Sequence, residues 1–158
     1  MKKAMPCCLF VLSLSLLFQS PAAAVNYGDF KSSTLTAKAW GEWNTRNYQD
    51  AIVYTNKCIE LYAEKARAMQ STLTDYPDGD TDYIHKNFWA LNDVATSLFI
   101  KGKSLMFLER EQEARVVFKD LIENFTFGQC WDSQGPWFWK PAKAILDEFG
   151  PVASIGSE

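Results

Sequence analysis

The sequence predicts an all-α fold, in which two antiparallel helical hairpins with extended central helices are followed by a C-terminal helix that closes the core. Two observations lead to this prediction. Apolar residues recur at intervals of three and four along most of the chain after residue 33, which is the spacing of one helix face. Turn-forming sequences, Arg46-Asn47 and Pro77-Asp78-Gly79-Asp80 among them, interrupt the periodic segments.

Residues 1–24 have the features of a secretory signal peptide. Lys2 and Lys3 precede an apolar run over residues 7–18, and Ala22-Ala23-Ala24 supplies the small residues of a cleavage site. The run is shorter than the roughly 20 residues of a membrane-spanning helix. We therefore expect a mature protein that begins at Val25 and is periplasmic or secreted; an uncleaved N-terminal anchor is the alternative.

The charge of the chain narrows the class of partner. Loss of Lys2 and Lys3 would change the net charge from −3 to −5, whereas a nucleic-acid-binding protein needs a basic face. No second apolar run is long enough to cross a bilayer.

We expect one helical domain over residues 25–150 and a frayed tail over residues 151–158.

The predicted helices cover residues 34–45, 48–75, 82–108, 112–125 and 141–149. A hydroxyl of Ser33 or Thr34 is expected to cap the first helix, and the third helix begins at Asp82 or Asn87. Pro141 is tolerated in the first turn of the last helix, which Gly150-Pro151 ends.

Residues 98–126 carry the most specific pattern in the chain. The key positions are Leu98, Gly102, Leu105, Ala114 and Phe118. Their spacing resembles the tetratricopeptide repeat (TPR), with its W-x2-LG-x2-Y, A-x3-F and P positions, and Thr126 stands in place of the proline. The small Gly102 and Ala114 would let two antiparallel helices approach closely, with Phe118 filling the space beside them.

A looser match to the same repeat lies earlier in the chain. Ala39 and Ala51 hold its small positions, while Glu42 and Thr55 depart from the pattern. Ala51 and Ala114 are 63 positions apart, against about 34 for adjacent repeats, which indicates extended central helices.

The TPR resemblance implies a scaffold that binds a peptide or partner protein in a concave groove, here as part of the cell envelope. Two hairpins are fewer than the roughly three repeats that a stable stack usually needs. The last helix is expected to close the open end of the core. The alternative is that a partner or a second copy of the chain covers it, as in a homo-oligomer.

The sequence offers little for catalysis, and we expect no enzyme, no metal and no cofactor. His85 is the one histidine, so paired-histidine zinc sites are excluded, and no glycine-rich phosphate loop or dinucleotide fingerprint is present. A small enzyme using carboxylates would need two acids converging beside His85.

Asp78, Asp80 and Asp82 resemble the opening of a calcium-binding EF-hand loop. Its sixth and twelfth positions hold Tyr83 and Trp89, where glycine and glutamate are needed. We interpret the segment as an acidic turn that caps the third helix.

The mature chain would keep two cysteines, Cys58 and Cys130. An exported protein could join them in a disulfide. The alternative is that both remain thiols, because Cys58 falls on an apolar helix stripe where small residues commonly pack.

The segment 128–141 is rich in aromatic residues, and Trp131, Trp137, Phe138 and Trp139 are its candidate binding residues. Exposed indoles could stack on sugar rings or anchor a peptide. A carbohydrate-binding module is therefore the alternative function. These rings could instead fold back and cover the end of the helical core.

Overall fold

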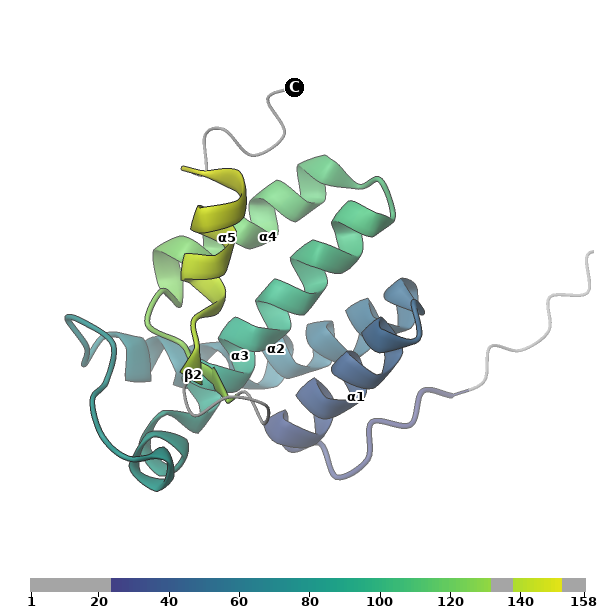
Figure 1. Ribbon diagram of the computed structural model, residues 1–158. Coiled ribbons are helices and arrows are strands. Elements are labelled where there is room, and N and C mark those ends of the chain that lie inside the picture. The colour runs from purple at the N-terminus through teal and green to yellow at the C-terminus, as the bar shows by residue number, and fades with distance from the viewer. Residues whose placement is uncertain (1–23, 132–137, 152–158) are drawn as a thin grey trace, which may run out of the picture.

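The computed structural model of the chain describes residues 24–131 and 138–151, and it confirms the all-α prediction (Figure 1). The helices are α1 (Ser32–Asn44), α2 (Tyr48–Gln70), α3 (Thr81–Phe107), α4 (Glu111–Asn124) and α5 (Pro141–Phe149). Two short antiparallel strands, β1 (Cys130–Trp131) and β2 (Phe138–Trp139), pair Cys130 with Trp139. The expected signal peptide, apart from Ala24, and Trp137 lie outside the described residues.

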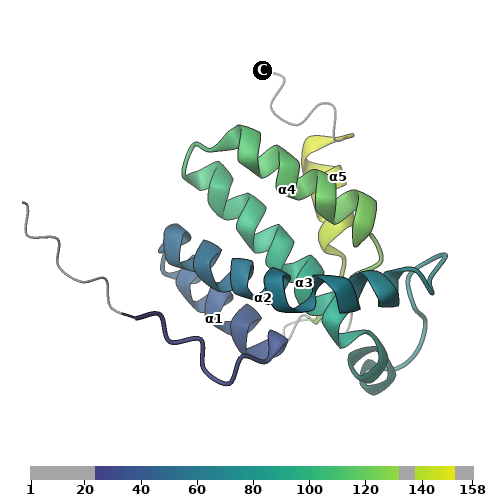
Figure 2. The same cartoon turned by 180° about the vertical axis from the view of Figure 1, so that it is seen from behind.

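The helices form two layers around the central α3. In Figure 1, α1, α3 and α5 lie toward the viewer, and α2 and α4 lie behind them, as the reverse view in Figure 2 shows. α3 packs against α1, α2, α4 and α5, so its side chains are buried along most of its length. α3 therefore organises the core.

The close approach of α3 and α4 that the sequence predicted is present. A Cβ on Gly102 would lie only 2.1 Å from Cε1 of Phe118, and both Phe118 and Ala114 are fully buried. In the first pair of helices, the small residues Ala39 and Ala51 are fully buried in one cluster with Ile100 of α3.

The last helix closes the core, as expected. The ring of Phe149 stacks on Phe118 with 5.7 Å between centroids, and Ile145 is fully buried. α5 contacts both α3 and α4, and its bounds, Pro141–Phe149, are those predicted from the proline and the following glycine.

The predicted cap of the first helix was wrong. α1 begins at Ser32, and its N-cap residue Lys31 makes no side-chain cap hydrogen bond. The Ser32 hydroxyl instead donates to the carboxylate of Asp93 on α3, because the start of α1 is packed against that helix.

The second helix is shorter than the sequence predicted, ending at Gln70 and not near Asp75. Its backbone tightens beyond this point, since the amides of Thr72 and Leu73 donate to carbonyls three residues earlier. The hydroxyls of Ser71 and Thr72 also bond to carbonyls three residues earlier, and such local bonds compete with a regular helix.

The acidic turn caps the third helix, as predicted. Oδ1 of Asp80 accepts a hydrogen bond of 2.8 Å from the amide of Tyr83, and the helix begins at Thr81. Phe88 has a non-helical backbone (φ −124°, ψ 19°), which kinks α3 between its first turns and the longer segment that follows.

Candidate functional site

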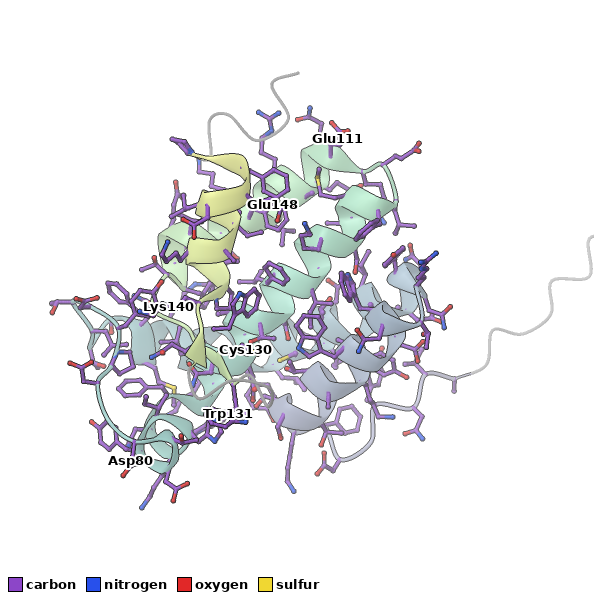
Figure 3. All side chains as sticks on the ribbon, viewed as in Figure 1. Asp80, Glu111, Cys130, Trp131, Lys140 and Glu148 are labelled. Atoms are coloured by element: carbon purple, nitrogen blue, oxygen red, sulfur yellow. The ribbon has the colours of Figure 1, made fainter. Side chains whose placement is uncertain are left out.

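A pocket of about 580 Å³ lies between α1, α3 and β1. Its lining residues are Ser33, Thr36, Ala37, Trp40, His85, Trp89, Asn92, Asp93, Thr96, Gln129, Cys130 and Trp131. In Figure 3 the labelled Cys130 and Trp131 mark the region where β1 crosses α3 near the start of α1. The pocket thus combines indole rings with amide, carboxylate and hydroxyl groups.

Helical spacing explains how two helices supply these side chains. On α3 the lining residues recur at three- and four-residue steps from His85 to Thr96, which places them on one face. On α1 the same spacing runs from Ser33 to Trp40. The two faces meet at the hydrogen bond of 2.5 Å between Oγ of Ser32 and Oδ2 of Asp93.

The third wall of the pocket is the segment that leads into β1. A Cβ on Gly128 would lie 2.3 Å from Cβ of Ala95, so glycine is needed for the chain to lie this close to α3. The next residue is held by its backbone, because the amide of Gln129 donates to Oδ1 of Asn92 at 2.9 Å. These contacts fix β1 beside the pocket.

A second hollow of about 300 Å³ adjoins the pocket. It is lined by Lys31, Ser32, Ser33, Tyr62, Trp89 and Asp93. Ser33, Trp89 and Asp93 line both hollows, so the two hollows share a wall.

Asp93 is the charged acceptor of this site. Burial raises the pKa of its carboxyl group, while the Ser32 hydrogen bond and the charge of His85 act in the opposite direction. The raised pKa means that the carboxylate has lost hydration that its protein partners do not fully replace. A ligand that donates a hydrogen bond to this carboxylate would replace part of the lost hydration.

Asn92 precedes Asp93 on the same face of α3 and is held by the segment that leads into β1, through the amide of Gln129. The residue is only 6% exposed, and its Nδ2 has no hydrogen-bond partner among the described residues. A buried amide nitrogen without a partner costs free energy, and this one has less than 1 Å² of accessible surface, so it is enclosed by the protein.

Of the four candidate aromatic residues, the structure describes the side chains of Trp131 and Trp139, which lie in different settings. Trp131 lines the pocket, is 41% exposed and meets the His85 ring edge-on at 6.0 Å. Trp139 does not line it; this ring is partly buried and packs edge-on against Phe99 at 4.4 Å. The side chains of Trp137 and Phe138 lie outside the described residues.

Two indoles of the pocket, Trp40 and Trp89, were not among the candidate binding residues. Both fit the period of an apolar helix face, and Trp40 also packs against the core. The nearby polar residues Asn92, Asp93 and Thr96 on the same turns of α3 were the available signal, since a purely structural face would hold apolar residues.

The pocket contains His85 and, among its described lining residues, one carboxylate, Asp93. The carboxylate enzyme considered from the sequence requires two acids there. Within residues 24–131 and 138–151, no cluster of three or more histidine, cysteine, aspartate or glutamate side chains is arranged to hold a metal ion. In the acidic turn it is Asp80 that caps α3.

Cys58 is a fully buried thiol and is not joined to Cys130. Its Sγ lies 3.7 Å from Oγ1 of Thr36, beneath the pocket wall, whereas Sγ of Cys130 lies 3.7 Å from the carbonyl oxygen of Trp131. The packing alternative for Cys58 thus describes this structure. Burial raises the pKa of the Cys58 thiol to about 11.

This raised pKa predicts slow alkylation of Cys58 in the folded protein. The thiolate is the reactive form, and raising the pKa from 9.0 to about 11 lowers the thiolate fraction at neutral pH by about 100-fold. Mass spectrometry after iodoacetamide treatment should find Cys58 protected until denaturant is added. Equal rates in the folded and unfolded protein would contradict the assignment.

The same shift predicts a fall in stability at alkaline pH. The unfolded thiol ionises near pH 9, whereas the folded thiol keeps its proton to about pH 11. The stabilisation is complete below pH 9 and is lost as the pH rises toward 11. Urea titrations over this range should show a shallower decline for Cys58→Ala than for the wild type.

Within the described part of the chain, no helix has both the length and the apolar character that crossing a bilayer requires.

No protein-family model matches the sequence, and no curated protein or solved structure is significantly similar to it.

Proposed function

We propose that this chain is an exported, non-catalytic binding module of the cell envelope, with TPR-like helical hairpins as its scaffold. The observation that carries the proposal is the pocket between α1, α3 and β1. Its volume of about 580 Å³ lies within the range of roughly 300–1,000 Å³ that is typical of ligand sites. The first helices of the two hairpins supply most of its wall.

A glycan is the ligand that this chemistry supports best. Trp40, Trp89 and Trp131 offer flat apolar rings, on which the C–H face of a sugar can stack. Asp93 lines the same pocket, and its carboxylate can accept a hydrogen bond from a sugar hydroxyl. The adjoining hollow provides room for a second sugar unit.

The second candidate is a scaffold for a partner protein, as the TPR resemblance implies. An aromatic cluster at the other ends of α1 and α3 favours it. Phe107 is 55% exposed, stacks on Tyr48 with 4.7 Å between centroids and lies 6.1 Å from the ring of Trp43. Exposed aromatic clusters are common anchors of protein interfaces, whether with another protein or a second copy.

The test is to fill the pocket and measure binding to glycan and peptide arrays. Ala37 lines the pocket and is exposed, so Ala37→Trp should occupy the site without disturbing the core. Ala68 is an exposed alanine on α2 that does not line the pocket, and Ala68→Trp is the matched control. We expect the wild type and Ala68→Trp to be retained on a glycan spot, and Ala37→Trp to bind it at least about tenfold more weakly.

Two results would contradict the proposal. Equal glycan binding by the wild type and Ala37→Trp would exclude the pocket as the site. If the array retained the protein on peptides alone, and Ala37→Trp did not change this binding, the partner-protein candidate would be supported. The cluster around Phe107 would then be the candidate interface.

A further inference from the structure

The pocket between α1, α3 and β1 combines three indole rings with one carboxylate. Trp40, Trp89 and Trp131 line it, and Asp93 is the one carboxylate among its described lining residues. Asp93 is partly exposed and lies on the wall that the two hollows share, so a ligand in either hollow can reach it. The face of an indole ring is electronegative and attracts a cation, as a carboxylate does. Both kinds of group therefore favour a positively charged ligand.

The Asp93 carboxylate keeps both its charge and acceptor capacity for such a ligand. Its Oδ2 receives the hydroxyl of Ser32 at 2.5 Å, and a carboxylate can accept several hydrogen bonds. Burial raises the pKa of the carboxyl group, while the Ser32 hydrogen bond and the charge of His85 oppose the rise. An ammonium group beside this carboxylate would replace lost hydration and also balance its charge.

The nearest lysine does not supply that balancing charge. Lys31 lines the second hollow and not the first, its side chain is 75% exposed, and its ammonium pairs with Asp29 at 3.0 Å. Among the described residues, no lysine or arginine forms an ion pair with Asp93. The charge of Lys31 is thus balanced by Asp29 at the rim of the site, and Asp93 can serve a cation in the first hollow.

We propose that the pocket selects a glycan that carries a protonated amine, with the ammonium group of the amino sugar placed against Asp93 and beside the indole rings. This inference rests on the proposed function, namely that the pocket binds a glycan. The ammonium group donates hydrogen bonds to the carboxylate, and the C–H face of the sugar packs on an indole. An N-acetyl group at the same place is neutral and offers a single N–H, so the acetylated sugar should bind more weakly.

The experiment compares two hexasaccharides with the same backbone on the full mature chain. The glucosamine hexamer carries an ammonium group on each ring at mildly acidic pH, whereas chitohexaose carries an N-acetyl group there. Calorimetry and tryptophan fluorescence give the affinities. We expect the glucosamine hexamer to bind at least about tenfold more tightly than chitohexaose. Added salt should narrow this difference, because mobile ions screen the charges.

Four variants separate the charge from the rings. Asp93→Asn keeps the shape of the side chain and should weaken the glucosamine hexamer by about tenfold, with chitohexaose changed by less than about twofold. Trp131→Leu removes a ring and should weaken both hexamers by about fivefold or more. His85→Gln removes a positive charge from the pocket and should strengthen only the glucosamine hexamer. Asp147→Asn on α5 also removes one negative charge, but it is exposed and outside the pocket, and should bind like the wild type. Thermal melting of each variant checks that it is folded.

A third probe tests whether the sugar rings matter. Hexalysine carries as many ammonium groups as the glucosamine hexamer but has no sugar. We expect it to bind at least about tenfold more weakly than the glucosamine hexamer. Equally tight binding that Asp93→Asn abolishes would show that the pocket recognises charge alone, and would overturn the assignment to an amino sugar.

The other outcomes separate this inference from the proposed function. Equal wild-type affinity for the two hexasaccharides, or a preference that a folded Asp93→Asn variant retains, would overturn the selection of an amine and leave glycan binding intact. A neutral glycan that binds when the glucosamine hexamer does not would have the same meaning. Failure of every oligosaccharide, with peptides bound on the arrays, would overturn the proposed function and this inference with it.

Discussion

Gly102→Ala is expected to lower the free energy of unfolding by about 1–3 kcal/mol, although alanine is the better helix former. The added Cβ would lie 2.1 Å from Cε1 and 2.6 Å from Cδ1 of Phe118. The Phe118 ring has little room to move, since it is fully buried and stacks on Phe149 of α5. Urea denaturation followed by circular dichroism measures the change.

Gly41→Ala is the matched control for this prediction. Gly41 also lies inside a helix, but a Cβ there would meet nothing within 4 Å. Removing the backbone freedom of glycine should therefore stabilise the protein by about 0.5–1 kcal/mol. If both substitutions stabilised the protein equally, the close contact between α3 and α4 would be wrong.

Gly128→Ala is expected to lower stability by about 1–3 kcal/mol and glycan affinity by about tenfold or more. Its Cβ would lie 2.3 Å from Cβ of Ala95 and 3.1 Å from the carbonyl oxygen of Leu91. The chain would have to move off α3, which breaks the hydrogen bond between Gln129 and Asn92 that holds the pocket wall. Stability and binding should therefore fall together.

A second substitution tests this cause directly. Ala95→Gly removes the methyl group that the new Cβ meets, so the double variant Gly128→Ala/Ala95→Gly should recover glycan affinity relative to Gly128→Ala alone. Its stability should recover less, because glycine inside α3 costs about 0.5–1 kcal/mol. Wild-type binding by Gly128→Ala itself would show that this contact does not position β1.

The helices were predictable from the sequence because their signals are local. The apolar period identified each helix, and Pro141 with Gly150 gave the bounds of α5 correctly. The spacing of Gly102 and Phe118 also predicted a close helix pair, since a missing side chain and a large ring are complementary. The C-terminal end of α2 was less predictable, because hydroxyl side chains after Gln70 compete with the helical hydrogen bonds.

The candidate site was only partly predictable, because tertiary contacts assemble it. Ser32 and Asp93 are 61 positions apart, and Asn92 and Gln129 are 37 apart, yet hydrogen bonds join both pairs. Trp131 was identified because aromatic residues are conspicuous in a loop. Trp89 was not, since a helix face that lines a pocket has the same period as one that packs in a core.

The most direct test of the pocket is to follow each indole N–H by NMR during titration with the glycan that the array retains best. Binding in the pocket predicts that the signals of Trp40, Trp89 and Trp131 shift together, since these rings line it. The signal of Trp139, which packs against Phe99 and does not line the pocket, should stay near its starting position. Shifts confined to Trp43 or Trp139, with the three pocket indoles unchanged, would contradict glycan binding in the pocket.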